Sequence, residues 1–269
     1  AGAAVTALLS ALTSAVILVD VATLDAYRFW AVGSLAGRDV DVTGQVVWFL
    51  AAGALSALEG DGHVPARVAG ASAGALVAGL WAGGVDANVM ERELILLKRE
   101  DFWDPGIGFG LLRGRMFRER VRSMLVQQTF EAARAPLSVS AWDVLARRTV
   151  VLERGDLSAA ICASCAFPGM FQPVWVNGRP MLDGGIADRP GHSGLRHGER
   201  VLFLHLPSKS PWRREAPPIP SRHGMVTVAA RDLPRLGPFR LKRAGDALNR
   251  AREAMMAALE RPLAPVIEA

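Results

Sequence analysis

The sequence is poor in cysteine: two of its 269 residues are Cys, and they lie close together at Cys162 and Cys165. Two cysteines are too few for a disulfide-stapled scaffold. The pair has the C-x-x-C spacing of a redox motif but none of its usual surroundings, and no second Cys or His cluster indicates zinc. We therefore interpret both as small buried residues, and we predict neither a metal site nor another cofactor.

The chain also lacks internal repeats and any motif for binding RNA or DNA, so we expect no nucleic-acid partner. Its net charge is +5, and the basic residues are unevenly spread. Residues 213–252 hold ten Lys or Arg against three Asp or Glu, and four arginines surround an apolar face in residues 113–125. Two interpretations are open for each segment: a solvated basic surface, or peripheral contact with an anionic membrane.

Charged residues are absent from the first 19 positions. That length suits a membrane span, but Thr and Ser dilute the segment and no basic region precedes it as in a signal peptide. A membrane anchor at residues 1–19 and a buried helix and strand are both open interpretations. We expect a cytoplasmic or peripheral membrane protein, with an apolar extension at 1–40 followed by one domain at 41–269.

Hydrophobic periodicity predicts strands that alternate with helices along the rest of the chain. This alternation, with 51% hydrophobic residues, indicates an α/β fold with a mostly parallel sheet and helices on both faces. Residues 101–110 are rich in Gly, Pro and aromatic residues and are predicted as a loop. The predicted helices are 51–59, 73–81, 113–125, 157–166 and 243–260, and the predicted strands are 64–69, 137–144, 149–152, 174–176, 179–182 and 201–206.

Two short motifs indicate chemistry. Gly70-Ala71-Ser72-Ala73-Gly74 has the G-x-S-x-G pattern of a nucleophile elbow, in which flanking glycines let the chain turn sharply from strand to helix and leave the serine hydroxyl exposed. Much later, the hairpin turn Asn177-Gly178 delivers a strand that ends in Asp183-Gly184-Gly185. In this order, the two motifs predict a serine hydrolase with a Ser72–Asp183 dyad.

Four segments together resemble the patatin-like phospholipase family. The resemblance covers residues 53 to about 206 and includes Ala163-Ser-Cys-Ala-Phe-Pro, which is similar to the family's Ala-Ser-x-Ala-x-Pro. It implies a three-layer α/β/α sandwich that cleaves acyl esters of lipids, with Ser72 as the nucleophile and Asp183 as its base. No histidine or cofactor is needed. The four segments are 53–62, 68–77, 163–171 and 178–185.

One element departs from the family pattern. The family has a Gly-rich run with a Lys or Arg whose N–H groups, with that of Ala73, form an oxyanion hole. Counting back places this run at 43–47, where only Gly44 remains, and residues 33–38 are a second candidate. Loss of one such donor costs about 3–4 kcal/mol, or about 100- to 1,000-fold in rate. The prediction is therefore a hydrolase of weak activity, and the alternative is a non-catalytic lipid- or acyl-binding relative.

Other interpretations of the site residues stay open. Ser72 is a favoured helix N-cap residue, and Asp183 could belong to an ordinary Asp-Gly turn. A Ser-Asp-His triad would follow the order Ser72, Asp183 and then a later histidine. The candidates for that third member are His192, His197 and His205.

Overall fold

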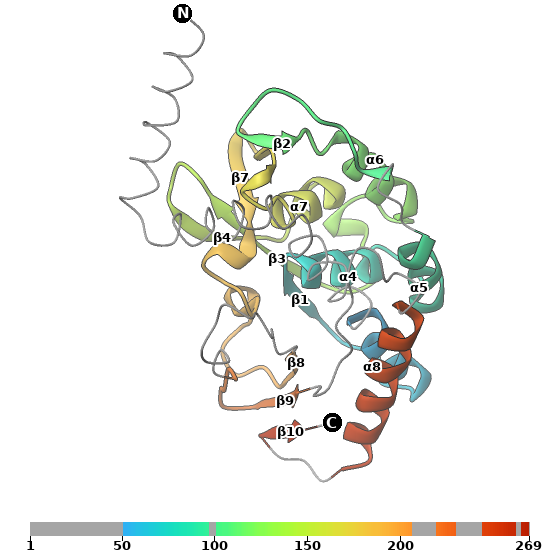
Figure 1. Cartoon of the computed structure of the whole chain (residues 1–269). Coiled ribbons are helices and arrows are strands. Elements are labelled where there is room, and N and C mark those ends of the chain that lie inside the picture. The colour runs from blue at the N-terminus through green and yellow to red at the C-terminus, as the bar shows by residue number, and fades with distance from the viewer. Residues whose placement is uncertain (1–50, 97–100, 206–218, 230–243, 262–264, 269) are drawn as a thin grey trace, which may run out of the picture.

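The structure is a computed structural model that describes residues 51–96, 101–205, 219–229, 244–261 and 265–268 (Figure 1). The predictions for the extension at 1–40, the anchor at 1–19 and both oxyanion segments lie outside these ranges. Parts of the basic segment 213–252 lie outside them as well. Within the described parts of the chain, no helix is both long and apolar enough to cross a bilayer.

The main sheet is built around its longest strand, β3 (Leu137–Asp143). Strand β1 (Val68–Ala71) pairs with it in parallel. The other pairings are antiparallel: β4 (Arg148–Leu152) and β7 (Arg179–Asp183) both pair with β3, and β6 (Val174–Val176) pairs with β7. Short turns join β3 to β4 and β6 to β7, whereas β3 and β7 are far apart in the sequence.

Strands β1 and β7 share one edge of β3. Strand β4 takes the opposite edge along Val139–Asp143, so both β1 and β7 must lie on the other one. They run in opposite directions, and their C-terminal ends meet: Ala71 pairs with Ser140, and Asp183 pairs with the adjacent Ala141. The register of β3 therefore brings the residue after β1 next to the last residue of β7.

Two buried helices, α4 (Ala73–Ala82) and α7 (Leu157–Ser164), pack on one face of this sheet. They approach closely: a Cβ at Gly79 would lie 2.5 Å from Cδ1 of Ile161. Side chains alternate along β3, as in any strand. Leu137, Val139 and Ala141 enter the core formed with these helices, whereas the intervening serines face the segment that follows β7.

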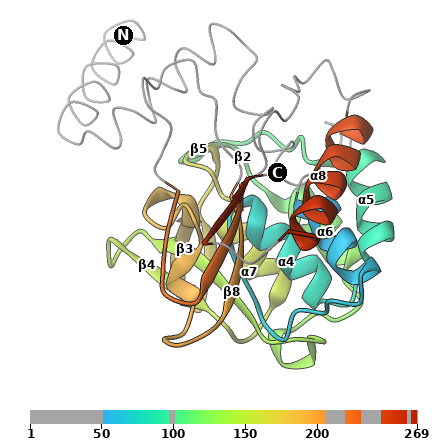
Figure 2. The ribbon, with the colours of Figure 1, turned by 90° about the horizontal axis from the view of Figure 1, so that it is seen from below.

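The remaining elements surround this core. Residues 51–60 are helical, and an ion pair of 3.0 Å between Arg252 and Glu91 joins α8 to α5, which lie side by side in Figures 1 and 2. Strands β8, β9 and β10 form a parallel sheet, and β2 pairs in parallel with β5. Their bounds are α5 (Ala87–Leu96), α6 (Arg115–Met124), α8 (Ala244–Leu259), β2 (Gly110–Leu112), β5 (Gly169–Phe171), β8 (Val201–His205), β9 (Met225–Ala229), β10 (Val266–Glu268) and the 3₁₀ turns η2 (Phe130–Ala132), η3 (Gly184–Ile186) and η4 (His192–Gly194).

The predicted α/β class is confirmed, and most predicted elements lie within two residues of their expected bounds. The first strand is an exception, because it runs over Val68–Ala71 rather than 64–69. Helix α6 begins at Arg115 rather than at 113, since the carboxylate of Asp104 accepts the N–H groups of Gly114, Arg115 and Met116 at its start.

Most arginines of α6 (Arg115–Met124) pair with acidic residues. Helix α6 buries Phe117 and Val121 against the core. Three of its arginines pair with acidic residues, and two of these pairs reach other elements. The helix therefore docks on the core, and these pairs neutralise much of its charge. The pairs are Arg115 with Glu119, Arg118 with Asp156 and Arg120 with Glu93.

Candidate active site

Ser72 lies at the sharp turn between β1 and α4. Its backbone has φ 52° and ψ −122°, a conformation that non-glycine residues rarely adopt. The turn needs a glycine before it, since a Cβ at Gly70 would lie 2.5 Å from the carbonyl carbon of Gly74. Although Ser72 occupies the N-cap position of α4, its side chain makes no capping hydrogen bond. The hydroxyl is thus turned away from the helix, as in a nucleophile elbow.

The Ser72 hydroxyl contacts Asp183 directly. Its Oγ donates a hydrogen bond of 2.7 Å to Oδ2 of Asp183, while Oδ1 accepts the N–H of Gly185, also at 2.7 Å. A Cβ at Gly184 would lie 2.1 Å from the carbonyl oxygen of Ser140. The two glycines of the Asp-Gly-Gly motif therefore have separate tasks: the first allows close approach to β3, and the second orients the carboxylate.

Burial sets the proton affinity of Asp183, which is 6% exposed. Removal from water raises the pKa of its carboxyl group from 3.8 to about 6, although the hydrogen bonds from Ser72 and Gly185 and the charge of Arg189 act in the opposite direction. Burial disfavours the charged form of a carboxyl group. The carboxylate is therefore a stronger base than an exposed aspartate, and it is still mostly ionised at neutral pH.

The segment that follows α7 holds both residues in place. The Oγ of Ser164, the last residue of α7, accepts the N–H of Ser72 at 2.8 Å and donates to a carbonyl of β3 at 2.6 Å. The thiol of Cys165 donates to the carbonyl of Ser72 at 3.2 Å, and the carbonyl of Ala166 accepts the N–H of Asp183 at 2.9 Å. Reasoning from the sequence missed these roles, although the Ala-Ser-x-Ala-x-Pro segment was the signal for them.

Both cysteines are reduced and buried, as expected. Burial raises the pKa of the Cys162 thiol to about 12 and that of Cys165 well above its ordinary value. A thiol needs to ionise to act as a nucleophile or metal ligand. These side chains therefore serve as packing residues, with Cys165 also bonded to the elbow. No group of three His, Cys, Asp or Glu side chains in the described ranges could hold a metal ion.

No histidine takes part in the Ser72–Asp183 contact. All five are among the described residues, and none hydrogen-bonds to either residue. The ring of His192 packs edge-on against Phe203, with ring centroids 4.8 Å apart. His63 pairs with the exposed Asp61. The geometry gives no support to a triad. Of the expected oxyanion donors, Ala73 begins α4 beside the hydroxyl, whereas Gly44 and residues 33–38 are not described.

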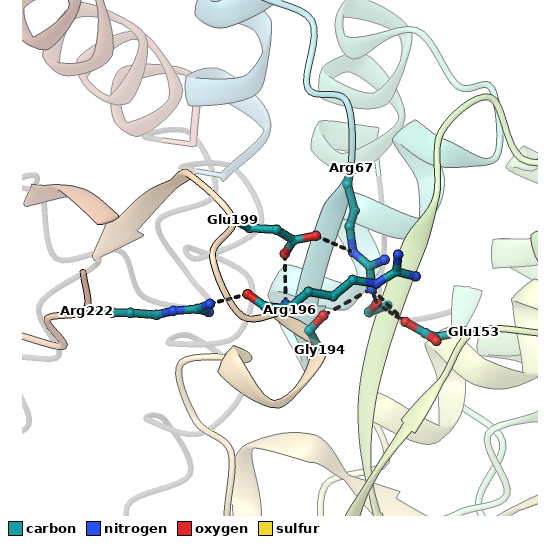
Figure 3. Close-up of polar contacts among 7 residues, drawn as sticks. Arg67, Glu153, Gly194, Arg196, Glu199 and Arg222 are labelled. Carbon is teal, nitrogen blue, oxygen red and sulfur yellow. Dashed lines mark hydrogen bonds and ion pairs between the residues drawn. The ribbon is translucent and has the colours of Figure 1, made fainter. Parts of the chain in front are cut away.

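A charged cluster at the other end of β1 anchors the strand. Figure 3 shows Arg67 between Glu153, the carbonyl of Gly194 and Glu199. Its Nη2 lies 2.6 Å from Oε1 of Glu153 and 3.1 Å from the carbonyl oxygen of Gly194. Its Nε lies 3.7 Å from Oε1 of Glu199. Arg67 also donates to Ser138 of β3. The cluster joins β1, β3 and β4 to the segment after Asp183 at the end of β1 opposite Ser72.

The family model for "Patatin-like phospholipase" matches residues 46–193. The match covers more than half of the chain and includes both Ser72 and Asp183. The chain therefore belongs to the patatin-like phospholipase family.

Among curated proteins, the chain is similar to proteins named "Uncharacterized NTE family protein" from Mycobacterium bovis and Mycobacterium tuberculosis. Each is 35% identical over 144 residues, which are 51% of this chain and 39% of the relative. The match thus spans well under half of their length. Among solved structures, VipD from Legionella pneumophila aligns with a TM-score of 0.43 and 15% identity over 70% of this chain and 48% of VipD.

Proposed function

We propose that the protein is a lipid acyl hydrolase in which Ser72 is the nucleophile and Asp183 is the base. Membership of the family supports hydrolysis of lipid esters. The observation that carries the finer proposal is the hydrogen bond of 2.7 Å between Ser72 Oγ and Asp183 Oδ2. It combines a strained elbow, a half-buried hydroxyl and a buried carboxylate in one arrangement.

In the proposed reaction, Ser72 Oγ attacks the ester carbonyl carbon while Asp183 accepts the hydroxyl proton. The N–H of Ala73 and the segment near Gly44 stabilise the resulting oxyanion. The proton then passes to the leaving alcohol, and an acyl-enzyme on Ser72 remains. Asp183 next takes a proton from water, which attacks the acyl carbon; the proton returns to Ser72 Oγ as the ester bond breaks and the fatty acid leaves. A carboxyl group with pKa about 6 makes the two proton abstractions, from Ser72 and from water, less uphill than an ordinary aspartate would.

A serine-reactive fluorophosphonate and a short p-nitrophenyl ester test this proposal together. We expect the label to react at Ser72, and the Ser72→Ala variant to lose both labelling and at least about 1,000-fold of the ester hydrolysis. The Ser123→Ala variant, which changes an exposed serine on α6, should retain both. A folded protein that neither labels nor hydrolyses the ester would favour the alternative, a lipid- or acyl-binding relative with a degenerate oxyanion loop.

A further inference from the structure

The loop between Pro105 and Leu111 exposes large apolar side chains. Ile107 is 104% exposed and Phe109 is 92% exposed, more than any other large apolar side chain of the described residues. Leu111, in the same loop, is half exposed at 50%. Single exposed apolar residues are common on protein surfaces, but a cluster at one tip marks a contact surface. We name residues 105–111 the apolar tip.

Hydrogen bonds hold the backbone of the apolar tip in place. The N–H of Gly106 donates to the carbonyl of Leu111 at 3.0 Å and closes the loop. The side-chain amide of Gln172 donates to the carbonyl of Ile107 at 3.1 Å. The backbone is thus hydrogen-bonded to itself and to the body of the protein. Its apolar side chains point into solvent because the fold holds them there.

Strands β2 and β5 connect the apolar tip to the segment that holds Ser72 and Asp183. Strand β2 begins within the tip at Gly110 and pairs with β5, with Gly110 opposite Gly169. The contact is tight, since a Cβ at Gly110 would lie 2.3 Å from the carbonyl carbon of Phe171. Strand β5 begins three residues after Ala166, and residues 164–166 hydrogen-bond both site residues. Figure 1 shows β2 at the same end of the molecule as α7 and β7.

We propose that the apolar tip inserts into the surface of a phospholipid bilayer and holds the Ser72 site against it. This inference rests on the proposed lipid hydrolase function and names the surface that would deliver its substrate. Residues 105–118 contain no acidic residue, and Arg113 is exposed at the base of the tip. An apolar end with a cationic base is the composition of an interfacial anchor for anionic lipids.

The position of Arg113 supports contact with a phospholipid bilayer. A Cβ at Gly106 would lie 2.2 Å from Arg113 Nε, so the arginine stem runs along the loop below the tip. Long basic side chains bury their stems in apolar surroundings while the charged end reaches the headgroups. With Ile107 and Phe109 among acyl chains, the Arg113 guanidinium would lie at the level of lipid phosphates.

A fluorescent thiol probe at the tip tests insertion directly. Both native cysteines are buried, so Ile107→Cys can be labelled selectively with an environment-sensitive dye. The matched control is Leu145→Cys, at a 65% exposed position on the turn between β3 and β4. With phosphatidylcholine vesicles containing phosphatidylglycerol, we expect a blue shift at position 107 and none at 145. Binding to vesicles with an unshifted probe at 107, or no binding at all, would overturn the proposal.

A double variant separates this inference from the proposed function. Ile107→Ser with Phe109→Ser should weaken vesicle binding at least about tenfold, because two apolar side chains lose their buried position in lipid. Val64→Ser with Leu145→Ser, at positions 70% and 65% exposed, should leave it unchanged. Vesicle binding is read by flotation and needs no turnover, so a protein without esterase activity still tests the tip.

The activity readout is the ratio of hydrolysis of vesicle phospholipid to that of a soluble ester. The tip variant should lower this ratio by a similar factor. If the tip variant instead changes the sedimentation of the protein and leaves vesicle binding intact, the tip is an interface between copies of the chain, and the proposal is wrong.

Discussion

Two aspartates at opposite ends of the β3–β7 ladder have opposite electrostatics. Asp143 lies opposite Met181 at one end, and Asp183 lies opposite Ala141 at the other. Both side chains are buried, with 2% and 6% exposure. The hydrogen bond from Arg179, together with the N–H groups of Ala146 and Leu145, lowers the pKa of Asp143 to about 2. Burial instead raises the pKa of Asp183 to about 6.

The difference shows that the partner of a buried carboxylate decides its role. Asp143 is bound to a guanidinium and to a turn, so its charge is fully used in holding structure. Asp183 has a hydroxyl and one N–H as direct partners, and they compensate its burial only in part. A carboxylate held in this state can accept a proton during a reaction and return it.

The largest expected difference between the two aspartates is the loss of activity when each is replaced by asparagine. Asp183→Asn removes the base and should lower kcat on a soluble ester at least about 1,000-fold, because members of a catalytic unit do not act additively. Asp143→Asn removes a carboxylate of similar burial outside the site, and should cost less than about tenfold if the protein stays folded. Equal losses in two folded variants would remove the functional distinction.

Asp183→Asn should lower the activity of the protein but raise its stability at alkaline pH. The folded pKa of Asp183 lies above its ordinary value of 3.8, so its ionisation opposes folding, fully above about pH 6 and not at all below about pH 4. Asp183→Asn should therefore raise the free energy of unfolding at pH 8 by about 2–3 kcal/mol. The gain should disappear toward pH 4, as measured by urea unfolding.

Asp143 provides the mirror image of this pH dependence. Its folded pKa is lowered, so its stabilisation is present above about pH 4 and is lost as the pH falls toward 2. Asp143→Asn should destabilise the protein at pH 8, with a difference that shrinks in acid. If Asp183→Asn also destabilises at pH 8, the buried carboxylate is better compensated than the structure indicates.

Two buried serines of α7 offer a second comparison between a residue at the site and one away from it, with smaller expected effects. Ser164→Ala leaves the N–H of Ser72 without its partner and should misalign the elbow, at a cost of about 1–3 kcal/mol in stability and in transition-state energy. Ser158→Ala removes a buried hydroxyl that bonds Asp156 at 2.6 Å, away from the elbow. We expect lower kcat with little change in KM for Ser164→Ala alone. A similar kcat in both variants would show that the Ser164 bridge has no positioning role.

Local sequence patterns predicted much of the fold. Alternating apolar residues located β3 and β4, the Asn177-Gly178 turn located the β6–β7 hairpin, and the G-x-S-x-G pattern located the elbow. These features depend on neighbouring residues, so a single sequence is sufficient to find them.

Features that depend on distant residues were not predictable in the same way. The meeting of Ser72 and Asp183 depends on the register of both strands along β3. The order of the two motifs and the family resemblance indicated the pair, but neither gave the register that brings it together. The arginines of α6 looked like a basic face because Glu93 and Asp156 are far from them in the sequence. The apolar tip was expected only as a loop, since exposure of Ile107 is a property of the packed molecule.

The pH dependence of kcat/KM on a soluble ester tests the central claim most directly. Activity requires the ionised form of Asp183, so it should rise about tenfold per pH unit below pH 6 and level off above it. The His192→Ala and His205→Ala variants should retain this profile. A transition near pH 4, or one that disappears when either histidine is replaced, would contradict the assignment of Asp183 as the base.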